Sequence, residues 1–294
     1  MRRSEDPMSL TRTVLFGEEG LSVQNDRILP FTRLVGTIIM PILFVASVIL
    51  YGFPTRTEQL FAWTIAPEMT PLIMGAGYGT GVYFFYRVAT IEEWHRVAPV
   101  FPGIAVFTWF MAAATFLHWE NFNHSHVTFY FWTLLYIVSP VLIPGIWLIN
   151  RRTDPREPGT ASLEMPDVLR WGAAISGVAI TLTAVVFFFV PHVMIEHWPW
   201  AVSPLTTRIL LGWFVLFGVA NLVVSLDRRW SAARILVHSQ VIGFSLVLVG
   251  VLRAWGNFDT ANPYTWPIVL GMAGYLLVIV GLYVVMERRA HAVA

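Results

Sequence analysis

The chain has 294 residues, of which 56% are hydrophobic and 13% are charged, and its mean hydropathy is +0.63. Soluble globular proteins carry roughly 25% charged residues, so the composition excludes a protein that folds mainly in water. The net charge of +1 gives no reason to expect nucleic acid as a partner. The lack of cysteine excludes disulfides, thiol catalysis and iron–sulfur clusters, and the lack of lysine excludes a retinal or pyridoxal Schiff base.

The apolar stretches of the sequence are long enough to cross a membrane, because about 18 residues of helix span a hydrocarbon core of roughly 30 Å. Backbone groups find no partner in lipid, and no strand alternation is visible, so each stretch should be helical. The sequence therefore predicts an all-α polytopic membrane protein with about eight transmembrane helices. The stretches run approximately over residues 34–53, 70–86, 97–117, 127–150, 171–191, 209–226, 235–252 and 264–286.

The arginines predict the orientation. They cluster before the first stretch and after every second one, and only Arg56, Arg208 and Arg253 fall on the other side. Because positively charged loops stay in the cytoplasm, we expect both termini there, in the cytoplasmic (inner) membrane of a bacterium. Residues 1–30 are predicted to be a cytoplasmic extension, with no cleavable signal. The loops at 54–69 and 118–126 should share the outer face.

Two regions of the chain resemble each other. Residues 53–77 read FPTRTEQLFAWTIAPEMTPLIMGAG and residues 190–214 read VPHVMIEHWPWAVSPLTTRILLGWF. Further along, WENF at 119–122 matches WGNF at 255–258. We interpret this as a duplication: a first four-helix repeat over 31–150 and a second over 167–294, joined by a cytoplasmic linker at 151–166. An even number of helices per unit makes the two repeats parallel.

Each unit carries the pattern W-x-x-x-P-x-x-T, from Trp63 to Thr70 and from Trp200 to Thr207. The pattern resembles paired motifs of uncharacterised multi-span membrane proteins of bacteria. The resemblance implies the membrane fold and the duplication, and it brings no activity, substrate or cofactor.

The motif has two interpretations. In the structural one it starts a helix, with Ser203 as the cap and Pro204 as the first residue, and Trp63, Trp198 and Trp200 anchor the protein at the membrane surface. In the functional one, the two outer loops meet and line a groove for an apolar or lipid-like molecule. The ligand-binding residues would then be Trp63, Glu68, Thr70, Trp200, Thr207 and Arg208. Arg208 would either pair with Glu68 or extend to lipid phosphate.

A second candidate site lies in the histidine-rich outer loop FLHWENFNHSH. Imidazole and carboxylate ligands suit zinc or copper, whereas the alternative is that an outer loop simply tolerates histidine. No H-E-x-x-H motif accompanies the histidines, and the cofactor stays open. The candidate metal ligands are His118, Glu120, His124 and His126.

Catalytic motifs are absent from the sequence: it has no G-x-S-x-G, P-loop or dinucleotide fingerprint. No Asp or Glu lies near the centre of a predicted span, which disfavours ion-coupled transport. We therefore predict a non-catalytic membrane protein that binds or passes a small apolar or lipid-like molecule between two pseudo-symmetric halves. The alternatives are a membrane metalloprotein with an outer-face His/Glu site and a structural or assembly subunit. The lipid bilayer is the expected partner; a membrane-protein partner or a homo-oligomer stays open.

Overall fold

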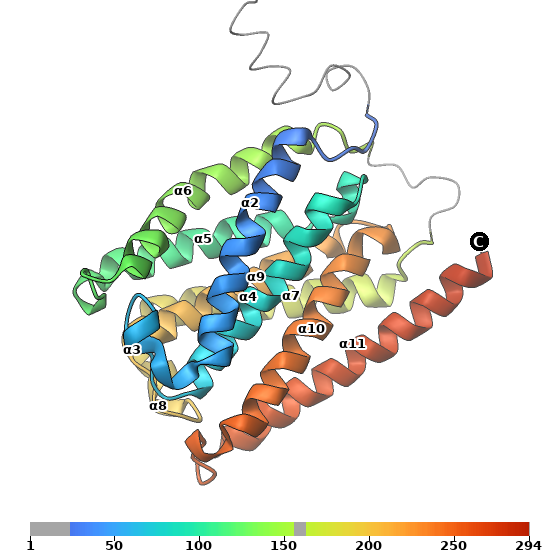
Figure 1. Ribbon diagram of the computed structural model, residues 1–294. Helices are drawn as coiled ribbons and strands as arrows, with labels where there is room; N and C mark the ends of the chain where they lie inside the picture. The colour runs from blue at the N-terminus through green and yellow to red at the C-terminus, as the bar shows by residue number, and fades with distance from the viewer. Residues whose placement is uncertain (1–23, 156–162, 294) are drawn as a thin grey trace, which may run out of the picture.

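The computed structural model of the protein describes residues 24–155 and 163–293, and this part of the chain is largely helical (Figure 1). Residues 1–23 of the predicted N-terminal extension and residues 156–162 of the predicted linker lie outside the described residues. Each predicted apolar stretch coincides with one long helix. The long helices are α2 (Pro30–Ser47, continued by a π-helical turn at Val48–Gly52), α4 (Met69–Thr90), α5 (Val100–Leu117), α6 (Val127–Asn150), α7 (Asp167–Phe189), α9 (Pro204–Ser225), α10 (Trp230–Arg253) and α11 (Thr265–Val293).

Shorter elements lie between the long helices. Two are α-helical, α3 (Thr57–Leu60) and α8 (Pro191–His197), and both follow the first helix of a predicted repeat. The others are 3-10 turns at Pro54–Arg56, Trp94–Arg96, Trp119–Asn121 and Trp255–Asn257.

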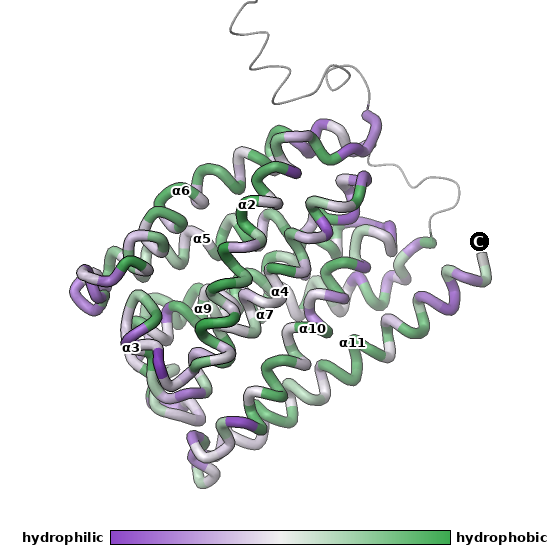
Figure 2. Tube along the Cα trace, in the orientation of Figure 1, coloured by the Kyte–Doolittle hydropathy of each residue, from purple (hydrophilic) through white to green (hydrophobic). Residues whose placement is uncertain are grey.

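The bundle has the surface of an integral membrane protein. Seven of its long helices are apolar and long enough to cross a bilayer. Hydrophobic residues run along the helices and hydrophilic residues gather at their ends (Figure 2). Large apolar side chains face outward, Val141 with 72% and Leu277 with 74% of its surface exposed, which water would not tolerate but lipid does. The predicted all-α polytopic membrane fold is thus confirmed.

The eighth long helix, α4, has the length to span a membrane but not the apolar composition of the other seven. Glycine, threonine and tyrosine take the place of aliphatic residues along it, and more than half of its residues are buried. Because neighbouring helices cover α4 on several sides, it needs little lipid-facing apolar surface. This explains why hydropathy alone gives a weaker signal for α4.

The helices pack in a regular pattern. Helix α2 packs on α4 and α7 on α9, while α5 packs on α6 and α10 on α11. Two further contacts cross between the predicted repeats, α4 with α10 and α9 with α5. Helix α9 is the most buried of the apolar spans, and α11 is the least buried. The core therefore centres on α4 and α9, and α11 lies at the periphery (Figure 1).

The turns gather at two ends of the bundle. We call one the Trp-rich end (residues 53–68, 118–126, 190–203 and 254–264) and the other the Arg-rich end (residues 24–29, 91–99, 151–155, 163–166 and 226–229). At the Trp-rich end the N–H of Asn123 donates to the carbonyl oxygen of Ala62 at 2.8 Å, so the loops at 54–69 and 118–126 lie at the same end of the bundle. That this end faces outward stays a prediction.

The same backbone contacts occur twice in the structure. The Asn123–Ala62 bond has a counterpart in the N–H of Asp259, which donates to the carbonyl oxygen of Pro199 at 2.8 Å. Below, two residues are called equivalent when they are as far apart in the sequence as Asp259 is from Asn123 or as Pro199 is from Ala62.

The Arg-rich end repeats its contacts as well. The N–H of Trp94 donates to the carbonyl oxygen of Asp26 at 2.7 Å, and the N–H of Trp230 donates to that of Leu163 at 3.0 Å. These contacts are the ones a duplicated unit would produce.

Candidate ligand-binding site

The two motif tryptophans lie inside the protein. Trp63 is 4% exposed and Trp200 is 3% exposed. Each ring packs edge-on against an equivalent phenylalanine, Trp63 on Phe122 at 5.0 Å and Trp200 on Phe258 at 4.9 Å between ring centres. An interfacial anchor keeps one edge of the indole in contact with lipid and water. The prediction that Trp63 and Trp200 are surface anchors is therefore wrong.

The second copy of the motif starts its helix as predicted. Ser203 is the N-cap of α9, its Oγ accepts the N–H of Thr206 at 3.2 Å, and Pro204 is the first helical residue. The first copy starts differently. Glu68 is the N-cap of α4 without a side-chain bond, and the N–H of Met69 donates to Oδ1 of Asn257 at 3.0 Å.

Only one of the two copies forms an indole–threonine hydrogen bond. Nε1 of Trp200 donates to Oγ1 of Thr70 at 3.0 Å, and Thr70 is fully buried. The equivalent pair is Trp63 and Thr207, whose Nε1 and Oγ1 are both buried without a hydrogen-bond partner. The motif therefore ties the halves together through Trp200 and Thr70.

Arg208 does not pair with Glu68 in the part of the chain that the structure describes. Its guanidinium bonds to Nε2 of His118 at 2.7 Å and to the carbonyl oxygen of Phe188 at 3.0 Å. The reason is that α9 packs on α5, whose end carries His118. Burial, and then the charge of Arg208, lowers the pKa of His118, so the neutral ring accepts the bond.

The predicted metal ligands do not converge. Nε2 of His124 lies 3.1 Å from the carbonyl oxygen of Trp119, and Nε2 of His126 lies 2.8 Å from that of Gln59. Among residues 24–155 and 163–293, no group of three or more His, Asp or Glu side chains is placed to hold a metal ion. Each histidine contacts a different part of the chain, because His118 bonds to Arg208 of α9, His126 faces Gln59 and only His124 contacts its own loop. The four residues concerned are His118, Glu120, His124 and His126.

A larger candidate site lies between α4, α9, α10 and α11. The structure has there an apolar cavity of about 340 Å³, lined by Trp198 and Trp200 towards the Trp-rich end and by Trp213 and Phe244 deeper in the bundle. Trp200 is the one residue of the predicted ligand-binding set that lines this cavity; Trp63, Glu68, Thr70, Thr207 and Arg208 do not.

Two of the glycines that line the cavity differ in the room beside them. Gly243 of α10 and Gly271 of α11 both line the cavity. A Cβ added at Gly271 would meet no atom within 4 Å, whereas one at Gly243 would lie 2.8 Å from Oγ1 of Thr80. Because α11 packs chiefly on α10 and is otherwise peripheral, it forms the wall between the cavity and the lipid.

On the other side of the α4–α9 pair, the residues at two equivalent positions are larger. Phe107 of α5 stands where α10 has Gly243, and Leu135 of α6 stands where α11 has Gly271. The space left there is about 90 Å³. Large side chains thus reduce the space beside α5. The first half keeps a separate apolar pocket of about 360 Å³ between α2, α4 and α6, lined by residues such as Phe61 and Leu135.

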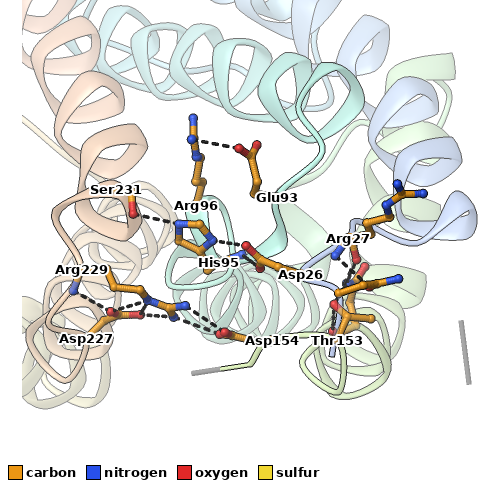
Figure 3. A network of polar contacts seen from close by, with 12 residues as sticks. Asp26, Arg27, Glu93, His95, Arg96, Thr153, Asp154, Asp227, Arg229 and Ser231 are labelled. Atoms are coloured by element: carbon orange, nitrogen blue, oxygen red, sulfur yellow. Dashed lines mark hydrogen bonds and ion pairs between the residues drawn. The ribbon is translucent and has the colours of Figure 1, made fainter. Parts of the chain in front are cut away.

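A polar network crosses the Arg-rich end (Figure 3). Arg229, whose side chain is 7% exposed, pairs with Asp154 at 3.0 Å and with Asp227 at 2.6 Å. Burial alone would lower the pKa of Arg229, but the hydrogen bonds that it donates to the Asp227 and Asp154 carboxylates, together with their negative charges, outweigh burial and raise the pKa. The guanidinium is therefore permanently charged, and it fastens residues after α6 to the start of α10.

The same network contains a chain of three residues in the order Asp26, His95 and Ser231. Nδ1 of His95 contacts the Asp26 carboxylate, and its Nε2 lies 2.8 Å from Oγ of Ser231 (Figure 3). Hydrolases use this order, but the neighbouring cleft of about 500 Å³ is lined by residues such as Arg151 and Arg229, and neither His95 nor Ser231 is among them. We interpret these three residues, called the latch below, as a hydrogen-bonded link between the two halves.

Sequence reasoning missed both the cavity and the latch. The latch residues lie far apart in the sequence and belong to no motif, so no local signal could have joined them. The glycines at 243 and 271 become informative only beside their bulky equivalents. Comparison with protein-family models, curated proteins and solved structures gave no match for this chain.

Proposed function

We propose that this integral membrane protein binds or passes a small, apolar or lipid-like molecule in the cavity between α4, α9, α10 and α11. The observation that carries the proposal is the apolar space of about 340 Å³ at the junction of the two halves. Ligand sites typically measure about 300–1,000 Å³ and are lined mainly by hydrophobic and aromatic side chains. The lining here has that character, and it includes Trp200 of the repeated motif.

The position of the cavity suits a ligand that arrives from the bilayer. Helix α11 separates it from the lipid and is the least buried of the apolar spans. The lining residues that α11 contributes are all uncharged: Pro267, Ile268, Gly271 and Met272. A small displacement of α11 away from α4 and α9 would open a path between the cavity and the membrane. An uncharged interior favours such a route over ion-coupled transport.

The proposal includes the orientation and the duplication. The Arg-rich end faces the cytoplasm, in keeping with the rule that positively charged loops stay inside, and the Trp-rich end faces outward. The chain is built of two parallel repeats, 31–150 and 167–294, as the twofold occurrence of the backbone contacts at both ends supports. The ligand site then lies where α4 of the first repeat meets the second.

The test is to fill the cavity without disturbing the fold. Gly271→Leu introduces the side chain that the equivalent Leu135 already has, into a place with no atom within 4 Å. Gly274→Leu is the matched control, because Gly274 lies on the same helix, also has open space around it, and does not line the cavity. Both proteins are placed in nanodiscs and titrated with radiolabelled decylbenzene.

We expect saturable binding to the unaltered protein and to Gly274→Leu, and loss of the saturable component in Gly271→Leu. Binding that is equal in both variants, or that never exceeds partition into empty nanodiscs, would refute the proposed function. A thermal unfolding curve for each variant separates loss of the site from loss of the fold.

A further inference from the structure

A second hollow of the molecule, the cleft of about 500 Å³, lies at the Arg-rich end. It shares none of its described lining residues with the apolar cavity. The cleft lies where α6 and α9 end and where α5 and α10 begin, so both halves form it. One part of its lining is apolar and includes Trp147 and Leu226, and the other consists of three arginines and two aspartates. A cleft with both kinds of lining suits an amphipathic ligand.

The two aspartates of the cleft are engaged by one of its arginines. Arg229 lies between Asp154 and Asp227, at 3.0 Å and 2.6 Å (Figure 3). Its charge is shared by two carboxylates of the protein itself, so it is not available to a ligand. Over the whole lining, the three arginines exceed the two aspartates by one positive charge.

The other two arginines of the cleft lack a strong internal counter-ion. Arg151 is exposed, its guanidinium lies 5.0 Å from the centre of the Trp147 ring, and it forms no ion pair within residues 24–155 and 163–293. Arg228 reaches Glu164 at 3.7 Å, but the two side chains are 58% and 60% exposed, so this pair contributes little. Both guanidiniums are therefore open to an external anion, and arginine is well suited to bind phosphate.

In the second half, the equivalent positions carry a complete ion pair. The equivalent of Arg151 is Glu287. This glutamate pairs with Arg234 and accepts the indole N–H of Trp230 at 2.9 Å. The equivalent of Arg234 is Ala98, which lines the cleft. The first half thus has an arginine where the second has a carboxylate, and a methyl group where the second has the partner cation.

The apolar part of the lining favours a lipid over a free phosphate ion. Leu226 follows the end of α9 with 79% of its surface exposed, and Val223 and Trp147 lie in the last turns of α9 and α6. A phosphate ion would leave this wall uncovered, whereas acyl chains can lie along it. The ends of membrane spans lie near the depth of the lipid headgroups, and basic pockets between helices there bind anionic headgroups.

We infer that this cleft binds an anionic phospholipid, whose phosphate group contacts Arg151 and Arg228 and whose acyl chains lie against Trp147, Val223 and Leu226. The inference does not depend on the proposed function, because the cleft and the apolar cavity have no described lining residue in common. The bound lipid would connect the end of α6 in the first half with the turn before α10 in the second.

The test counts the lipid molecules on the full-length protein by native mass spectrometry in detergent. Dioleoyl phosphatidylglycerol and dioleoyl phosphatidylcholine are titrated separately; they share chains and phosphate, but choline neutralises the second lipid. We expect the first phosphatidylglycerol to bind at least about 5-fold more tightly than the first phosphatidylcholine, because each arginine near an anionic lipid contributes about that factor. Equal affinities would overturn the inference.

Three substitutions locate the lipid. Arg151→Gln and Arg228→Gln each remove one charge and should each weaken binding of the first phosphatidylglycerol about 5-fold. Arg152→Gln is the matched control, because Arg152 is also exposed and does not line the cleft; it should leave the affinity nearly unchanged. If all three variants weaken binding equally, the lipid responds to the general charge of this end and the inference is wrong. Thermal unfolding checks that each variant keeps the fold.

Two further measurements separate the cleft from other sites. Excess inorganic phosphate, compared with acetate at the same ionic strength, should not displace the lipid; displacement would indicate a site for free phosphate and overturn the lipid assignment. Gly271→Leu, which fills the apolar cavity, should leave phosphatidylglycerol binding unchanged. Loss of the lipid in that variant would place it in the cavity and contradict the inference, whereas a failure of decylbenzene to bind would refute the proposed function alone.

Discussion

The two sides of the α4–α9 pair share a backbone plan and differ in what their side chains fill. On the α5–α6 side, Phe107 and Leu135 leave about 90 Å³; on the α10–α11 side, Gly243 and Gly271 contribute to a space of about 340 Å³. The turns at the ends of the bundle make the same backbone contacts twice. The difference therefore lies in the packing beside α5 and α10 and not in the fold. The first half has a comparable apolar pocket, of about 360 Å³, in another place, between α2, α4 and α6.

The motif tryptophans show a second difference between the halves. Trp200 bonds to Thr70 across the junction, whereas the equivalent Trp63 packs 4.8 Å from Trp132 of its own half and leaves its N–H unpaired. The equivalent of Trp132 is Ile268, which lines the cavity. The aromatic residues of both halves pack against each other, but Trp200 also bonds across the junction and lines the proposed site.

The largest predicted effect tests the filled side. Phe107→Ala should lower the free energy of unfolding by about 3–5 kcal/mol, because it removes a buried ring and leaves a cavity. Gly243→Ala, at the equivalent position, should cost far less, since only the side chain of Thr80 must move. Chemical unfolding in detergent measures both. Similar losses would show that the two sides are not packed differently.

A slightly smaller effect is expected at the Arg-rich end. Arg229→Ala removes the guanidinium that pairs with Asp154 and Asp227 and should cost about 3 kcal/mol, at the lower end because the two carboxylate side chains are 14% and 19% exposed. The equivalent Glu93 pairs with Arg96 at the surface, 41% and 34% exposed, so Glu93→Ala should cost less than about 1 kcal/mol. If the two variants lower the free energy of unfolding equally in the same assay, Arg229 does not form a stabilising buried ion pair.

The tryptophan pair gives a smaller contrast. Trp200→Phe and Trp63→Phe remove the same ring volume from two buried sites, but only the first breaks a hydrogen bond and leaves Thr70 unpaired. Trp200→Phe should therefore destabilise by about 1 kcal/mol more than Trp63→Phe. Thermal unfolding of both variants with Thr70→Val, in a double-mutant cycle, measures the coupling. The same coupling energy with Thr70 for both tryptophans would contradict the claim that only Trp200 bonds to Thr70.

The smallest effect concerns pH. The pKa of His118 is lowered in the fold, first by burial and then by Arg208, so the folded state disfavours protonation. Its contribution to stability is complete above the unfolded pKa of about 6.5 and is lost as pH falls below that value. His118→Gln should flatten the stability profile between about pH 7 and pH 5. An unchanged slope in the variant would mean that His118 does not titrate in this range.

Much of the fold could be predicted from the sequence because lipid imposes simple rules. Every long helix coincides with a predicted apolar stretch, and α4 was recognised although buried polar residues and glycines weaken its hydropathy. The start of α9 at Ser203 and Pro204 followed from capping chemistry that is local in sequence.

The site could be predicted only in outline. A Trp next to a proline at a helix end has the same local pattern whether it faces lipid or the core, so the burial of Trp63 and Trp200 depended on partners from distant segments. Arg208 bonds to His118 and not to Glu68 because α5 packs on α9. No sequence motif predicts that these two helices pack together. The importance of Gly271 emerges only when it is compared with Leu135.

The most direct test of the central claim is competed photolabelling with a benzophenone-tagged decyl chain, mapped by mass spectrometry. We predict that excess decylbenzene removes label from cavity-lining residues of α10 and α11, such as Val247 and Met272, and that their equivalents Met111 and Tyr136 on the filled side take none. Label that is competed equally on both sides, or that is not competed on α10 and α11, would contradict the account.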